Sequence, residues 1–60
     1  MKGIELVKLL KRNGWKTERI KGSHYVMKKD DQTEIIPVHN TDLPAGLLNA
    51  ILKRRGLKQR

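Results

Sequence analysis

Residues 15–38 read WKTERIKGSHYVMKKDDQTEIIPV, and this stretch decides the fold because polar and large side chains alternate in three short runs. Alternation with a period of two is typical of β-strands. Between the runs, Lys21-Gly22-Ser23 and Lys29-Asp30-Asp31-Gln32 are turn signals. Pro37 lacks a backbone donor, which places it in an edge strand or at a strand end. We therefore expect an antiparallel meander with strands over residues 15–20, 24–28 and 33–38.

Two amphipathic segments flank these strands. In residues 3–13 the apolar side chains that recur at helical spacing are Ile4, Leu6, Val7, Leu9 and Leu10. Asn13-Gly14 ends this helix, because glycine adopts the left-handed conformation of a helix C-terminus at little cost. A second helix begins near Leu43-Pro44, with Asp42 as an acidic cap, and ends at Gly56. Its buried stripe is expected to be Leu47, Leu48, Ile51 and Leu52.

The predicted order is α-β-β-β-α, which belongs to the α+β class. Because the connections are short, the economical packing is a three-stranded antiparallel sheet with both helices on one face. We treat residues 1–60 as a single domain. Within the first strand, alternation places Trp15, Thr17 and Arg19 on one face.

The charge balance points to a polyanionic partner. The chain has 14 Lys and Arg against 6 Asp and Glu, a formal net charge of +8. Such a density favours nucleic acid through contacts to phosphates, and an acidic protein surface would satisfy it too. The chain has no cysteine, so disulfides and Cys-rich zinc sites are excluded and a reducing cytoplasm is the expected location. No run approaches the roughly 20 apolar residues of a membrane span, and no signal-peptide h-region is present.

The candidates for chemistry are few. His24 and His39 lie in different loops without a carboxylate at ligand spacing, so no metal or other cofactor is predicted. Ser23 is poorly placed for activation by His24, because adjacent residues of an extended segment point to opposite faces. RNA, however, carries its own nucleophile, the 2′-hydroxyl. A histidine can take up or supply a proton near neutral pH, and lysines or the Gly22 amide can neutralise the crowded phosphate.

The residues alone leave the role and direction of His24 open. Lone histidines at strand ends are common, and on this ground alone a structural role is favoured for both histidines. If Tyr25 and Met27 pack under the helices, alternation sends His24 and Lys28 outward together, where they would meet one phosphate. If Val26 is the core residue instead, His24 lies at the rim on the helix side.

Several motifs, in this order and spacing, resemble the HicA toxin family over nearly the whole chain. They are Lys11-Arg12-Asn13-Gly14-Trp15, Lys21-Gly22-Ser23-His24, Ile36-Pro37-Val38-His39, and Leu43-Pro44 followed by Leu48, Ile51, Leu52, Lys53 and Gly56. The resemblance implies a double-stranded-RNA-binding-domain-like fold, an mRNA interferase with His24 as its catalytic residue, and a HicB antitoxin that covers the site. The chain departs from the family pattern at Asp30-Asp31, where members often have more glycine, and at Gly46-Leu47, where they commonly have Gly-Thr.

With the resemblance included, the leading hypothesis is a cytoplasmic toxin endoribonuclease that acts on mRNA without a metal and is neutralised by a HicB-type antitoxin. The expected substrate contacts are Lys21, Gly22, Ser23, Lys28 and Lys29. The free toxin is expected to be monomeric and to enter a toxin–antitoxin hetero-oligomer. Two alternatives stay open: a non-catalytic RNA-binding module, and a domain whose charge serves only an acidic protein partner.

Overall fold

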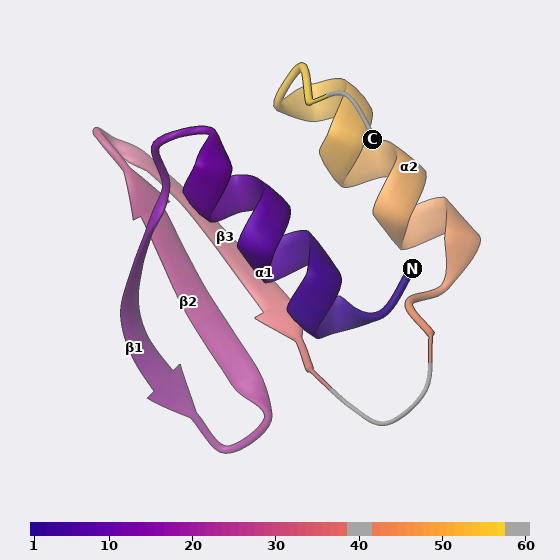
Figure 1. The fold of residues 1–60 in the computed structure, drawn as a ribbon, viewed down its shortest axis with the longest axis horizontal. Helices are drawn as coiled ribbons and strands as arrows, with labels where there is room; N and C mark the ends of the chain where they lie inside the picture. Colours follow the sequence, from indigo (N-terminus) through magenta and orange to yellow (C-terminus); the bar gives the residue numbers. More distant parts are fainter. Residues whose placement is uncertain (39–41, 58–60) are drawn as a thin grey trace.

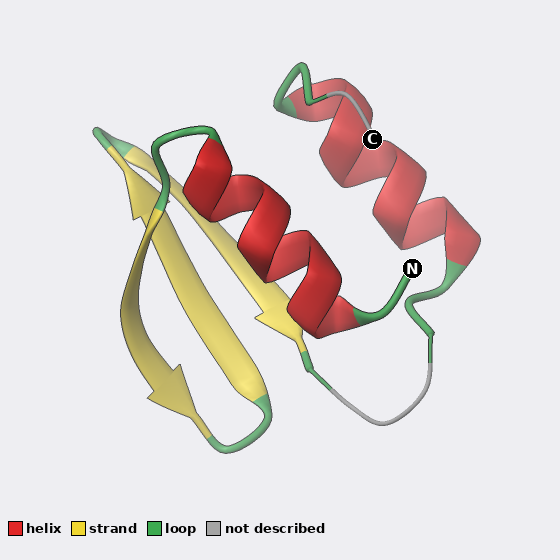
Figure 2. Ribbon diagram, in the orientation of Figure 1, coloured by secondary structure: helices red, strands yellow, loops and turns green. Residues whose placement is uncertain are grey.

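The computed structural model describes residues 1–38 and 42–57. Its elements are α1 (Gly3–Arg12), β1 (Lys16–Lys21), β2 (His24–Lys29), β3 (Gln32–Pro37) and α2 (Ala45–Arg54). The order is the predicted α-β-β-β-α, and the α+β class is confirmed (Figures 1 and 2). Most of the strand ends differ from the predicted ones by one residue.

The three strands form one antiparallel sheet in the order β1-β2-β3. In Figure 1, α1 lies over the sheet and α2 runs beside α1 on the β3 side. The core lies between the helices and the sheet and consists of Leu6, Val7, Leu9, Leu10, Trp15, Met27, Ile36, Leu43, Leu48 and Ile51. Pro37 is the last residue of an edge strand, so its missing donor interrupts no ladder.

Burial along β2 decides which face of the sheet His24 occupies. Met27 is fully buried and Tyr25 packs against the core, so the odd-numbered residues of β2 face the helices. Alternation then places His24, Val26 and Lys28 on the opposite, open face. The first of the two arrangements that the sequence allowed is therefore the one found.

A β-bulge at Glu18 changes the pattern of β1. Thr17 pairs with Met27 and Arg19 pairs with Val26, so one residue is extra on the β1 side. Since directly paired residues share a face, Thr17 faces the helices and Arg19 the open side. The prediction that Thr17 and Arg19 share a face is wrong, because the bulge shifts the alternation by one residue.

The start of α2 also differs from the prediction. Pro44 occupies the N-cap position without a side-chain cap, and the helix begins at Ala45. Asp42 is not the cap, because it lies further upstream and forms an isolated β-bridge with Lys2. The predicted end is correct: Gly56 has a φ of 64°, after the last helical turn.

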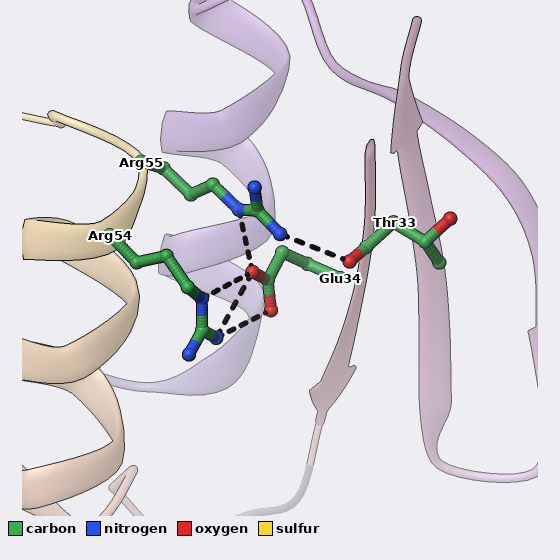
Figure 3. A network of polar contacts seen from close by, with 4 residues as sticks. All are labelled: Thr33, Glu34, Arg54 and Arg55. Carbon is green, nitrogen blue, oxygen red and sulfur yellow. Dashed lines mark hydrogen bonds and ion pairs between the residues drawn. The ribbon is translucent and has the colours of Figure 1, made fainter. Parts of the chain in front are cut away.

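Two arginines hold α2 against the sheet (Figure 3). Glu34 of β3 is 7% exposed and accepts hydrogen bonds from Arg54 at 3.1 and 3.0 Å and from Arg55 at 2.6 Å. Arg55 also lies over the ring of Trp15, 5.3 Å from its centroid. A carboxylate on the helix side of β3 therefore fixes the C-terminal turn of α2.

Candidate functional site

The turn between β1 and β2 presents His24 at one end of the sheet. Gly22 has a φ of 61°, a conformation that glycine adopts without strain, and a Cβ there would meet open space. The Ser23 carbonyl accepts a hydrogen bond of 2.6 Å from the Val38 amide, which ties the turn to the end of β3. The turn is thus anchored on one side, and His24 is exposed where β2 begins.

Lys21 lies directly opposite His24. The two residues are the last cross-strand pair of β1 and β2, so both are on the open face. Directly opposed Cβ atoms in such a pair are about 5 Å apart. An ammonium group and an imidazole therefore lie within reach of one phosphate, with the backbone of Gly22 and Ser23 beside them.

Lys28 lies on the same face as His24 but is distant along the strand. Four residues of β-strand span about 13 Å, which is too far for Lys28 and His24 to share one phosphate. Its ammonium group pairs with Glu18 at 3.6 Å, and both side chains are about half exposed. Lys28 therefore belongs to the open face but not to the immediate surroundings of His24.

Lys29 is separated from His24 by both direction and distance. It follows the alternation of β2 to the helix side, and its Nζ donates a hydrogen bond of 2.9 Å to the carbonyl of Asn13. In Figure 1 this end of β2 lies opposite the end that carries the β1–β2 turn. The structure thus gathers Lys21, Gly22 and Ser23 around His24 and leaves Lys29 elsewhere.

The open face also carries cations that the sequence analysis did not select. Lys16 pairs with Lys28, and Arg19 pairs with Val26, so both point away from the helices. Arg19 reaches this face because of the bulge, which no glycine or proline marks in the sequence. Lys16 could have been found from alternation alone, since it lies between Trp15 and Thr17, which alternation places together on the other face.

A comparison with known protein families shows which family the chain belongs to. The family model described as the HicA toxin of bacterial toxin-antitoxin matches residues 3–57, which include both helices, the sheet and the turn with His24. The chain belongs to the HicA toxin family. No curated protein and no solved structure matched it. The protein is therefore a toxin of a bacterial toxin–antitoxin system.

The described surface of this HicA toxin is open. Within residues 1–38 and 42–57 there is no enclosed pocket, and no three His, Asp or Glu side chains gather into a candidate metal site. None of the helices in this part of the chain combines the length and apolar character needed to cross a membrane. His39, the second histidine of the sequence analysis, lies outside the described residues.

Proposed function

We propose that this HicA-family toxin is an endoribonuclease that cleaves mRNA in the cytoplasm by acid–base catalysis at His24, without a metal ion. The observation that carries the proposal is the placement of His24, which is exposed beside Lys21 on an open, cationic face of the sheet. A net charge of +8 supports a polyanionic substrate. Family membership supports the role of a toxin.

In the proposed reaction, the 2′-oxygen of one ribose forms a bond to the adjacent phosphorus, and the bond from phosphorus to the 5′-oxygen breaks. The His24 imidazole takes the proton of the 2′-hydroxyl or supplies the proton of the leaving 5′-oxygen, and solvent water accepts or supplies the other proton. The products are a 2′,3′-cyclic phosphate and a 5′-hydroxyl. Lys21 and the backbone of Gly22 and Ser23 stabilise the phosphate as its negative charge grows.

Lys28 and Lys29 take different places in this proposal. Lys28, on the open face, contacts a phosphate further along the substrate than the one being cleaved. Lys29 is turned toward Asn13, so it contributes to the general positive field rather than to a contact beside His24.

A HicB-type antitoxin is the proposed partner. Family membership places the chain in a toxin–antitoxin pair, and a partner that covers the open face would block His24 directly. The cations of that face favour an acidic partner surface. We propose that the toxin is monomeric when free and hetero-oligomeric with its antitoxin.

The test is RNA cleavage by purified protein in EDTA, comparing wild type with His24→Ala. Lys8→Gln serves as a charge control, because Lys8 is exposed on α1, away from the open face. Circular dichroism establishes that all three proteins are folded. We expect cleavage by wild type and Lys8→Gln and loss of at least a hundredfold in His24→Ala. Equal cleavage by His24→Ala, or no cleavage by folded wild type with or without magnesium, would refute the proposal.

The runner-up function is a non-catalytic RNA-binding module. The cations of β1 favour it, because Lys16, Arg19 and Lys21 would hold RNA without any contribution from His24. RNA binding that persists in His24→Ala, together with absence of cleavage by wild type, distinguishes this function from the leading one.

A further inference from the structure

We propose that the open face binds one extended strand of RNA lengthwise, with phosphates along β1 and bases over apolar side chains of β2 and β3. This inference rests on the proposed function, since it takes RNA as the substrate. It goes further by giving the strandedness of the substrate and its direction across the sheet. It also assigns roles to Lys16, Arg19, Val26 and Ile35.

The β1 side of the open face is a line of cations. The pairs Lys16–Lys28, Arg19–Val26 and Lys21–His24 place one β1 cation in each of three successive outward rows. Within residues 1–38 and 42–57, Lys16, Arg19 and Lys21 take part in no ion pair. Because Lys16 and Lys21 lie opposite Lys28 and His24, they are separated by about 13 Å, long enough for several phosphates of one backbone. A polyanion that follows β1 would meet a cation in every row.

The β3 side of the same face carries Ile35 and Pro37, with the polar Thr33 in the row of Lys28. Val26 is directly opposite Ile35, a residue that is 55% exposed. In the next row, Pro37 is opposite His24. The net charge of +8 favours an anionic ligand, and the exposed aliphatic side chain favours a flat, apolar one. A ligand with negative charge along one edge and flat, apolar groups along the other would meet both. A nucleotide strand has this division between its phosphates and its bases.

The two sides combine into rows that match one nucleotide each. Arg19, Val26 and Ile35 form one row across the sheet, so a phosphate at Arg19 would place its base over Val26 and Ile35. The row with Lys21 and His24 follows about 7 Å along the strands. The neighbouring phosphate then lies at His24, and the nucleotide held by Arg19 and Ile35 flanks the bond that is cut.

A double helix fits this face poorly. In a duplex the bases are stacked inside, so Ile35 and Val26 would meet no base and only the phosphate contacts would remain. The aromatic residues do not contribute to base binding here, since Trp15 is buried and Tyr25 packs against the core. Aliphatic side chains support bases of any identity, so weak sequence preference follows.

The test measures binding by fluorescence anisotropy with a 2′-O-methyl oligonucleotide, which cannot be cleaved by attack of its own 2′-hydroxyl. The variants are Lys16→Gln and Arg19→Gln for the phosphate line and Ile35→Thr for the base contact. Lys8→Gln and Lys11→Gln remove the same charge from the exposed face of α1 and serve as matched controls. All five substitutions are at exposed positions, and circular dichroism establishes that each variant is folded.

We expect Arg19→Gln and Lys16→Gln to weaken binding and to reduce the slope of log affinity against log salt by about 0.7 each. Ile35→Thr should weaken binding about fivefold with an unchanged slope. The two α1 controls should change affinity less than about twofold. A duplex of the same length should compete less well than the single strand.

Two results would overturn the inference. The first is an effect of Lys8→Gln or Lys11→Gln as large as that of Arg19→Gln, which would place the RNA on the helices. The second is a duplex that binds as tightly as the single strand, with Ile35→Thr silent. The proposed function fails separately: if natural RNA is not cleaved by wild type, the binding results with uncleavable RNA still decide where the strand lies.

Discussion

The strongest structural prediction concerns Glu34, which joins β3 to α2. In Glu34→Gln the side chain keeps its size but loses its charge, and its amide group brings donors toward two arginines that are themselves only donors. Arg55 is then left as a cation whose side chain is 16% exposed, with the Thr33 carbonyl at 3.3 Å and the Trp15 ring as remaining contacts. We expect α2 to lose its main polar attachment to the sheet.

The size of the effect follows from the exposure of each partner. Removing one partner of a buried pair costs about 3–5 kcal/mol, and Arg55 is slightly solvated, so its share is about 2 kcal/mol. The Arg54 side chain is 52% exposed, so its share is about 1 kcal/mol or less. The sum is about 3 kcal/mol. In a chain of 60 residues this lowers the melting temperature by roughly 20 °C.

The assay is thermal and urea unfolding followed by circular dichroism, begun near freezing so that the variant starts folded. Arg54→Gln and Arg55→Gln are matched substitutions at neighbouring positions, and double variants with Glu34→Gln give the coupling energies. We expect coupling of about 2 kcal/mol for Arg55 and below about 1 kcal/mol for Arg54. Equal coupling of both arginines, or a cost of Glu34→Gln no larger than that of Glu18→Gln at the half-exposed pair, would refute the reasoning.

Three further predictions concern glycines, each checked by urea unfolding. Gly3→Ala should destabilise the fold by about 1–3 kcal/mol, because the new Cβ would collide with the Pro37 carbonyl oxygen. Gly46→Ala is the control within α2. It should stabilise the fold by up to about 1 kcal/mol, since a Cβ there meets open space. Equal effects of Gly3→Ala and Gly46→Ala would contradict the close approach of α1 to β3. Gly22→Ala should cost about 1 kcal/mol through its φ of 61° alone, and no cost would mean that the turn relaxes readily.

The helices and strands of this fold could be predicted from the sequence because each has a recognisable local sequence pattern. The amphipathic period gave α1, and alternation with polar turns gave the hairpins. Glycine marked the end of both helices, at Gly14 with a φ of 93° and at Gly56 with a φ of 64°. Such patterns involve only residues that are close together in the chain, so they can be recognised without knowledge of the tertiary structure.

The contacts that position the site could not be predicted from such local patterns. The bulge at Glu18 turns Arg19 outward, although Thr17-Glu18-Arg19 contains no residue that marks a bulge. The hydrogen bonds that Arg54 and Arg55 donate to Glu34 join residues about twenty positions apart and depend on how α2 packs against the sheet. Lys29 was predicted to contact the substrate, but alternation turns it to the helix side, where it donates a hydrogen bond to Asn13. The fold was therefore predictable from local patterns, whereas the make-up of the open face required the pairing register.

In the proposed reaction, the chain supplies proton transfer and cations while the RNA supplies the nucleophile. The most direct measurement maps the cleavage position in an RNA oligonucleotide and then replaces the single ribose on its 5′ side by 2′-deoxyribose. We expect cleavage at that bond to be abolished in the modified strand, and the unmodified strand to yield a 2′,3′-cyclic phosphate end. Cleavage of the modified strand at the same bond and at an undiminished rate would show that water is the nucleophile, and would contradict the proposed reaction.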